Sequence, residues 1–165
     1  MIIGEHIRLR SIDQRDLSLF TSWLNDPEVR QYLDLYLPLS MEEEVKWFEG
    51  LNSRPADERP LMIEFNTPDG WVAVGNVSLM NIDWRNRLAE IGIVIGEKRF
   101  WNQGIGRQTM SLMIKHGFET LNLNRIFLRV YEPNERGIRA YENAGFIHEG
   151  RMRQAVYING NYHDV

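Results

Sequence analysis

The sequence contains no cysteine among its 165 residues. Disulfide bonds, thiolate metal sites and a cysteine nucleophile are therefore excluded. Any acyl transfer by this chain has to pass directly from donor to acceptor, without an acyl-cysteine intermediate. A reducing compartment is the natural expectation for such a chain, so we expect a cytoplasmic protein.

Long hydrophobic runs and a strong net charge are also absent. No stretch approaches the roughly 20 apolar residues of a membrane span, and the segment from Met1 to His6 lacks the basic and apolar parts of a secretory signal. The net charge of -4 gives no general attraction to nucleic acid or acidic lipid. The 4 histidines are scattered without ligand spacing. We therefore expect no membrane, nucleic-acid or metal partner.

What remains is the composition of an ordinary globular protein. Hydrophobic residues make up 43% of the chain and charged residues 25%, and this length is enough to bury one sizeable core. No internal repeat, low-complexity tract or linker divides the sequence. We therefore expect a single domain over residues 1–165.

Hydrophobic periodicity predicts the elements of the N-terminal half. The pattern indicates a strand at 7–10 and then two helices between 13 and 33, interrupted at Asn25-Asp26-Pro27. Ser40 and Glu43 form a capping box that opens a further helix. The period then changes, and three antiparallel strands are predicted at 61–65, 72–79 and 89–95.

The C-terminal half alternates helix and strand. A helix after the segment 101–107 has one apolar face, made of Met110, Met113, Ile114, Gly117, Phe118 and Leu121. The remaining predicted elements are a strand at 125–131, a helix at 135–143 closed by Gly145, and a final hairpin built from Phe146 onward and 154–157, before the Asn159-Gly160 turn. The order predicts a mixed α/β fold, in which the strand–helix–strand unit after Ala89 supplies a parallel pair with a right-handed crossover.

Gly104 and Gly106 stand one residue apart between the strand at 89–95 and the helix that follows. Glycines in this place let an anion such as a pyrophosphate approach the backbone N–H groups at the positive end of a helix. A tight turn without a ligand explains the same spacing equally well. A Walker-type phosphate loop does not fit, because Gly-Lys-Ser/Thr is missing, and a dinucleotide fingerprint lacks its third glycine.

Three segments resemble the GNAT superfamily of N-acetyltransferases. Trp101-Asn102-Gln103-Gly104-Ile105-Gly106 is similar to motif A, where Gln or Arg usually takes the first position. The tryptophan is familiar from the branch that acetylates ribosomal-protein N-termini. The run from Glu132 to Phe146 looks like motif B, and the run from Tyr157 to Val165 is similar to the closing hairpin of bacterial spermidine acetyltransferases. The resemblance covers nearly the whole chain.

The resemblance implies a fold, an activity and a cosubstrate. The fold is a mixed, mostly antiparallel central sheet flanked by helices, with a parallel strand pair at the acetyl-CoA site. The activity is direct acetyl transfer from acetyl-CoA to a primary amine, on a protein N-terminus or a small molecule, through a ternary complex. The residues expected at acetyl-CoA are Ile93, Val94, Ile95, Asn102, Gln103, Gly104, Ile105, Gly106, Arg107, Asn134 and Arg136.

Tyr141 is the expected general acid. Its place seven residues after Asn134 matches the tyrosine that the superfamily sets beside the CoA sulfur, where a phenol can protonate the departing thiolate. Without the resemblance, an ordinary core aromatic facing Ile138 would be the better interpretation. Asn134 is expected to cap the helix, with a hydrogen bond to the pantetheine arm as its second role. Arg136 is expected to approach the CoA phosphates, and Arg139 is the weaker candidate for this role.

Glu90 is the candidate base, because it carries the only charge in the apolar strand at 89–95. A carboxylate at the start of this strand could take a proton from the amine, directly or through water. An end-of-strand residue exposed to solvent is the alternative interpretation. The backbone at 93–95 is expected to pair with the pantetheine amides and to hold the thioester carbonyl.

The sequence leaves the acceptor open. The aromatic residues of the N-terminal third, in a region that shapes the acceptor pocket in the superfamily, are expected to be mostly core: Trp23, Tyr32, Tyr36 and Trp47. Asp34, Glu42 and Glu43 could attract a cationic amine, although a solvated helix start explains Glu42 and Glu43 equally well. Polyamine acetylation, a non-catalytic CoA-binding sensor and a ligand-free interaction domain are the alternative functions. The oligomeric state also stays open, and a homodimer is compatible with the sequence.

Overall fold

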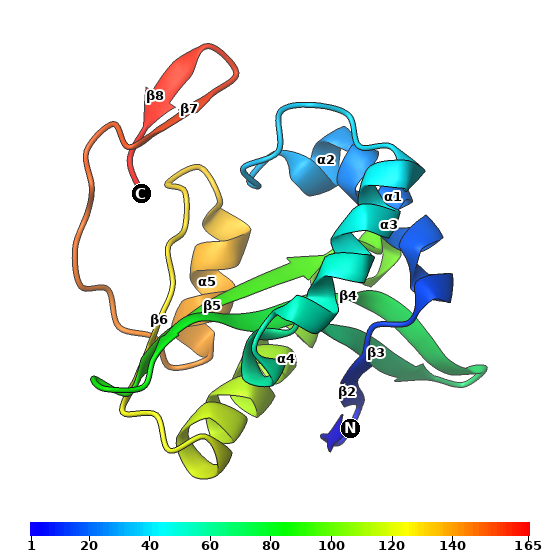
Figure 1. Cartoon of the computed structure of the whole chain (residues 1–165). Helices are drawn as coiled ribbons and strands as arrows, with labels where there is room; N and C mark the ends of the chain where they lie inside the picture. Colours follow the sequence, from blue (N-terminus) through cyan, green and yellow to red (C-terminus); the bar gives the residue numbers. More distant parts are fainter.

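The computed structural model describes residues 1–165 and places a six-stranded sheet at the centre of the molecule (Figure 1). The strands follow one another across the sheet in sequence order. All neighbours are antiparallel except β5 and β6, which are parallel. Their bounds are β1 Ile2–Ile3, β2 Ile7–Ser11, β3 Leu61–Thr67, β4 Gly70–Asp83, β5 Leu88–Ile95 and β6 Arg125–Phe127. The predicted fold class is therefore confirmed.

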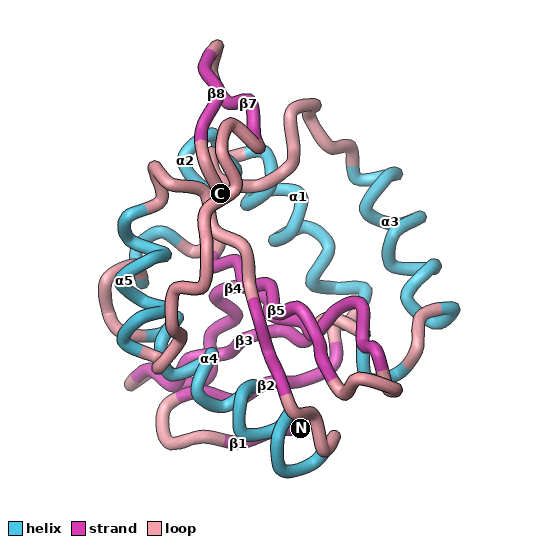
Figure 2. Tube along the Cα trace, turned by 90° about the vertical axis from the view of Figure 1, so that its left-hand side faces the viewer, coloured by secondary structure: helices cyan, strands magenta, loops and turns pink.

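Five α-helices and a separate hairpin complete the fold. The helices are α1 Leu17–Asn25, α2 Pro27–Arg30, α3 Met41–Gly50, α4 Ile105–Lys115 and α5 Glu135–Asn143. The hairpin consists of β7 Val156–Ile158 and β8 Asn161–His163, and Figure 2 shows it projecting at one end, away from the six-stranded sheet. No helix has the length and the apolar character that a membrane span requires.

Local chemistry explains where the helices begin and end. The predicted capping box is present at α3, where the Ser40 and Glu43 side chains each bond the other residue's backbone. The side chain of Asp26 accepts from the Glu28 N–H and Pro27 starts α2, which separates α2 from α1. Gly145 has a φ of 95° after α5, as expected of a left-handed cap.

Two hydrophobic clusters lie on opposite faces of the sheet, because successive side chains of a strand alternate. Buried residues of α4 pack with Ile63 and Ile91 on one face. Buried residues of α1 and α2 pack with Met62 on the other, joined there by partly buried residues of α3. Along β5 the same alternation places Ile93 and Ile95 against the α4 cluster and Val94 against the α1 cluster.

Three expectations for the C-terminal half were wrong. β6 ends at Phe127 instead of Tyr131, and no strand begins at Phe146. These two differences have the same cause. Residues 128–130 and 147–151 form no backbone–backbone hydrogen bonds, so neither segment has a neighbouring strand. Phe118 is 43% exposed, because α4 passes into a π-helical turn at His116–Thr120 that shifts the expected apolar face.

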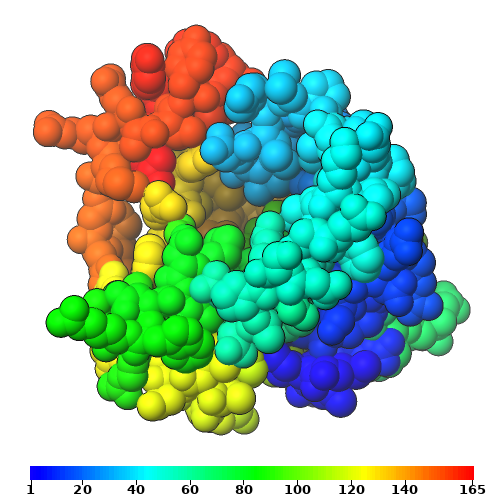
Figure 3. Space-filling view, viewed as in Figure 1, coloured from blue at the N-terminus to red at the C-terminus, as the bar shows by residue number.

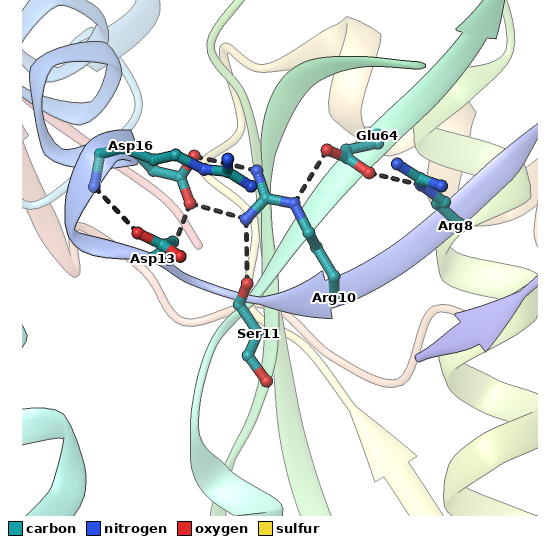
Figure 4. Close-up of polar contacts among 7 residues, drawn as sticks. Arg8, Arg10, Ser11, Asp13, Asp16 and Glu64 are labelled. Atoms are coloured by element: carbon teal, nitrogen blue, oxygen red, sulfur yellow. Dashed lines mark hydrogen bonds and ion pairs between the residues drawn. The ribbon is translucent and has the colours of Figure 1, made fainter. Parts of the chain in front are cut away.

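A buried ionic network fastens the start of α1 to the sheet (Figure 4). Arg10 donates to Glu64 at 2.8 Å and, through both terminal nitrogens, to Asp16 at 2.7 and 2.9 Å. Arg8 donates to the other oxygen of Glu64 and lies 4.5 Å from the centre of the Trp71 ring. Burial alone raises the pKa of Glu64, but the hydrogen bonds and charges of the two arginines outweigh it and hold this pKa below its usual value.

Glu64→Gln should lower the free energy of unfolding by roughly 3 kcal/mol, because it leaves two partly buried arginines short of one counter-charge. Because the pKa of Glu64 is lower in the folded than in the unfolded state, its ionised form stabilises the fold above the unfolded-state pKa of about 4. This contribution to the free energy of unfolding is lost as the pH falls through the folded-state pKa. Urea unfolding of wild type and variant should therefore differ at neutral pH and converge in acid. Glu42→Gln removes an exposed pair with Lys46 and should change stability by about 0.5 kcal/mol or less. Equal losses in both variants would contradict the assigned role of the network.

Candidate active site

β5 and β6 separate after three residue pairs, of which Glu90 and Phe127 form the last. Beyond Glu90, β5 has register partners only in β4. Gly96 N donates to Val74 O, and in this register alternation directs the backbone groups of Val94 to β4 and those of Ile93 and Ile95 to the gap. The Ile95 carbonyl is already occupied, because it accepts from Trp101 Nε1 at 2.8 Å. The Ile93 N–H and C=O and the Ile95 N–H are therefore free for an extended ligand.

The glycine loop sits at the adjacent end of α4. Gly104 is the N-cap, with φ 75° and ψ 5°, and no side chain caps the helix. The first backbone bond of the helix is Gln108 N to Gly104 O, so the N–H groups of residues 105–107 have no partner within the helix. A Cβ added at Gly106 would meet no atom within 4 Å, so the loop surface is open. These N–H groups at a positive helix end fit a pyrophosphate.

Arg136 brings a positive charge to this loop from the first turn of α5. Its guanidinium carbon lies 3.6 Å from the centre of the Trp101 ring. Burial lowers the pKa of Arg136, and the groups that counter this effect are the hydroxyls of Tyr32 and Tyr141, not carboxylates. A half-buried cation without an acidic partner suits a site for an anion.

Tyr141 and Asn134 lie on the same helix as Arg136. Asn134 Oδ1 accepts from Gly137 N at 3.0 Å, which is the predicted cap. Tyr141 packs edge-on against Phe146, with 6.2 Å between the ring centres. Burial raises the pKa of the Tyr141 phenol, and the nearby Arg136 charge opposes this effect only in part. The phenol is therefore protonated at neutral pH and able to donate a proton.

Glu90 is neither free nor exposed. Arg129 holds both of its oxygens, from Nε at 2.9 Å and from Nη2 at 3.1 Å, and the Glu90 side chain is only 12% exposed. This pair crosses from β5 to the segment after β6, at the point where the strands separate. Arg129 was not among the residues expected at the site. A signal was present, because Glu90 is the only charge in the strand predicted at 89–95, and Arg129 is the only charge after Arg125 in the strand predicted at 125–131 to run parallel to it.

The segment that links α2 to α3 lies in the region where the acceptor was expected. Trp23 is buried and Trp47 packs on Phe20, but Tyr36 is 84% exposed and is therefore the member of the aromatic group that lies outside the core. The Tyr32 hydroxyl donates to Pro133 O at 3.0 Å and so ties this segment to the start of α5.

Two of the three acidic residues expected to attract an amine instead form interactions within α3. Glu42 pairs with Lys46 and Glu43 caps the helix. Asp34 is exposed. Burial of Tyr131 is the main cause that raises the pKa of this tyrosine, and the negative charge of Asp34 is the second cause. Asp34 therefore remains as the acidic residue that faces the end of the segment after β6.

Comparisons with known proteins agree with this geometry. Residues 6–147 match the acetyltransferase (GNAT) domain family. Spermidine N(1)-acetyltransferase of Vibrio cholerae is 26% identical over 163 residues, which cover 99% of this chain and 91% of the relative. The ribosomal N-acetyltransferase-like protein YdaF of Bacillus subtilis is 29% identical over 174 residues, which cover 99% of this chain and 90% of the relative.

A solved structure supports the same assignment. The crystal structure of the Vibrio cholerae spermidine N-acetyltransferase in complex with CoA and spermine superposes with a TM-score of 0.85 at 25% identity, covering 98% of this chain and 92% of that one. With a family match over most of its length, an open glycine loop and a parallel strand pair that separates, this chain belongs to the GNAT family of acetyl-CoA-dependent N-acetyltransferases.

Proposed function

We propose that residues 1–165 act as one domain that transfers acetyl from acetyl-CoA directly to a primary amine within a ternary complex. One arrangement carries the proposal. An uncapped helix start and an unpaired Arg136 lie on the donor side, and a protonated Tyr141 stands on the same helix as that arginine. A binding protein without turnover has no need of the buried phenol.

The donor would be held mainly by backbone groups. The N–H groups of 105–107, together with the loop at Asn102 and Gln103, bind the pyrophosphate, and Arg136 supplies the counter-charge. Ile93 and Ile95 pair with the pantetheine amides through their free groups. Asn134 can serve both of its expected roles, because Oδ1 is used in the cap while Nδ2 keeps its two donors.

The chemistry then needs two proton transfers. A neutral amine attacks the thioester carbonyl, the C–N bond forms and the C–S bond breaks. Tyr141 donates its phenolic proton to the departing sulfur and regains a proton from solvent. The amine loses its own proton to Glu90 or to water. Because Arg129 holds Glu90, the direct route requires that one carboxylate oxygen be released from the pair.

Two acceptor classes fit the proposal about equally. A polyamine is supported by the spermidine acetyltransferases among the relatives and by the exposed Asp34 at the acceptor side. A protein N-terminus is supported by the ribosomal N-acetyltransferase-like relative. Release of free CoA thiol from acetyl-CoA, measured with spermidine, spermine and peptides with free N-termini, separates the two. If the protein bound CoA tightly but no amine caused release of the CoA thiol, catalysis would be excluded and a CoA-binding sensor would be the remaining function.

Tyr141→Phe should lower kcat by roughly a hundredfold, because it removes the proton donor for the thiolate. The Kd for acetyl-CoA should change little, since the ring still packs against Phe146. Tyr157→Phe, at an exposed tyrosine of the hairpin, is the matched control and should leave both quantities unchanged. An unaltered kcat in Tyr141→Phe would remove this residue from the mechanism.

Gly104→Val should abolish acetyl-CoA binding measured by calorimetry, because a β-branched residue at a φ of 75° distorts the loop. Gly70→Val imposes similar backbone strain at a φ of 111° in the turn between β3 and β4. This control should lose stability yet bind acetyl-CoA normally. Normal binding by Gly104→Val would exclude the loop as the pyrophosphate site.

Glu90→Gln and Arg129→Gln each break the same ion pair but differ in what they leave behind. If Glu90 is the base, Glu90→Gln should lower kcat roughly tenfold or more, whereas Arg129→Gln frees the carboxylate and should keep most of the activity. Steady-state kinetics against pH make the comparison. Equal losses in both variants would assign the pair to structure and the proton to water.

A further inference from the structure

Trp101 takes the first position of the glycine motif, and other parts of the chain fix its side chain on two sides. Its Nε1 donates to the Ile95 carbonyl oxygen at 2.8 Å, which ties the indole to the end of β5. The ring also packs against the cluster of α1 and α2, in which Phe20 and Trp23 are buried. The indole is therefore held in place by contacts within the chain.

The face of this indole carries Arg136. The guanidinium carbon lies over the ring, 3.6 Å from its centre, well within the roughly 6 Å range of a cation–π contact. A stacked guanidinium uses its face, while its five N–H donors lie in its plane and point outward. No protein oxygen accepts from these donors, and Glu135, the next residue in the sequence, pairs instead with Arg139 at 3.3 Å. The stack thus fixes the cation and leaves its hydrogen-bonding edge free.

Burial of α5 does not fix Arg136. No residue of this helix is buried, and its partly buried Tyr141, which packs on the α4 cluster, comes later in the helix. Figure 3 shows a hollow between the blue segment after α2 and the green strands, with the yellow chain that leads into α5 behind it. The start of α5 is held to other elements by the Tyr32–Pro133 hydrogen bond and by the stack on Trp101. Of these two contacts, only the stack places the charged group of Arg136.

We propose that Trp101 is a positioning residue for the donor, because it holds the Arg136 guanidinium flat with its N–H edge available to the pyrophosphate of acetyl-CoA. This role rests on the proposed contact of Arg136 with the CoA phosphates. Immobilising a flexible arginine opposes binding, and a side chain that is already held avoids most of this loss. Gln and Arg, the usual residues at this motif position, offer no aromatic face to a cation.

Trp101→Leu should raise the Kd for acetyl-CoA about fivefold to tenfold, because the guanidinium is no longer held. Trp101→Phe keeps an aromatic face but lacks the indole N–H, so its Kd should stay within about threefold of the wild-type value. Calorimetry at one fixed salt concentration measures both. Trp84→Leu, at a tryptophan that is 53% exposed in the turn between β4 and β5, is the matched control and should bind as the wild type does.

A donor without phosphates separates the positioning of Arg136 from other effects of the substitution. S-acetylpantetheine keeps the thioester and both amides of acetyl-CoA but has no phosphate for Arg136 to bind. Trp101→Leu should therefore leave the Kd for S-acetylpantetheine unchanged, as measured by chemical-shift titration. Arg136→Gln should likewise weaken the binding of acetyl-CoA alone.

A double variant tests whether Trp101 acts through Arg136. If it does, Trp101→Leu combined with Arg136→Gln should have the same Kd for acetyl-CoA as Arg136→Gln alone. Arg136→Lys tests the stack from the other side, and it serves also where Trp101→Leu does not fold. Lysine keeps the charge but has no planar group to stack, so the Kd should rise about fivefold.

Four results would overturn the proposal. A wild-type Kd for acetyl-CoA in Trp101→Leu and Arg136→Lys would mean that the stack is not needed. An equal loss with S-acetylpantetheine would assign Trp101 to the pantetheine site or to the fold. Losses that multiply in the double variant would mean that the two residues act independently. Equal losses in Trp101→Phe and Trp101→Leu would assign the effect to the hydrogen bond with Ile95.

These measurements report binding and do not depend on acetyl transfer. If no amine caused release of the CoA thiol but the variants behaved as expected, the proposed catalysis would fail and the role of Trp101 would stand. If the thiol were released but the two residues acted independently, the reverse would hold. Failure of the two proposals is therefore distinguishable.

Discussion

The separation of β5 and β6 is the constraint on which the rest of the structure depends. β6 is packed closely at its start, where a Cβ on Gly117, in the π-helical turn after α4, would lie 2.6 Å from Ile126 Cδ1, so a larger residue there would force the Ile126 side chain to shift. After Phe127 the chain turns away toward α5, and the backbone of β5 is left free at Ile93. One short pairing thus leaves a gap between β5 and the segment after β6.

The proposed donor side concentrates positive potential in a protein whose net charge is -4. The potential comes from the free N–H groups that start α4 and from Arg136, which stacks on Trp101 and has no acidic partner. Composition alone could not indicate this, because a helix end contributes no formal charge. Local geometry therefore decides which anions the protein attracts.

The sequence was sufficient where the signal was local. The bounds of α5 and the capping box of α3 followed from side chains within a few residues, and the strand predicted at 89–95 coincides with β5 to within one residue. The sequence was not sufficient where the structure of a segment depends on residues far away in the chain. The length of β6 and the state of Phe146 depend on a neighbouring strand, and the Glu90–Arg129 pair joins residues 39 positions apart. The site residues came from family resemblance, since G-x-G spacing alone fits a plain turn.

The two hydrophobic clusters on opposite faces of the sheet lie beneath different parts of the candidate site. The cluster under α4 lies beneath the loop proposed to bind acetyl-CoA, and the cluster under α1 to α3 lies beneath the helices proposed to face the acceptor, which the Arg10 network fastens to β2 and β3. The two sides also meet beyond the sheet, because Trp101, which stacks on Arg136, packs against the cluster under α1, and the Tyr32 hydroxyl bonds Pro133 O. Acceptor preference could therefore be redesigned without weakening the proposed grip on the donor only where substitutions spare Trp101 and Tyr32.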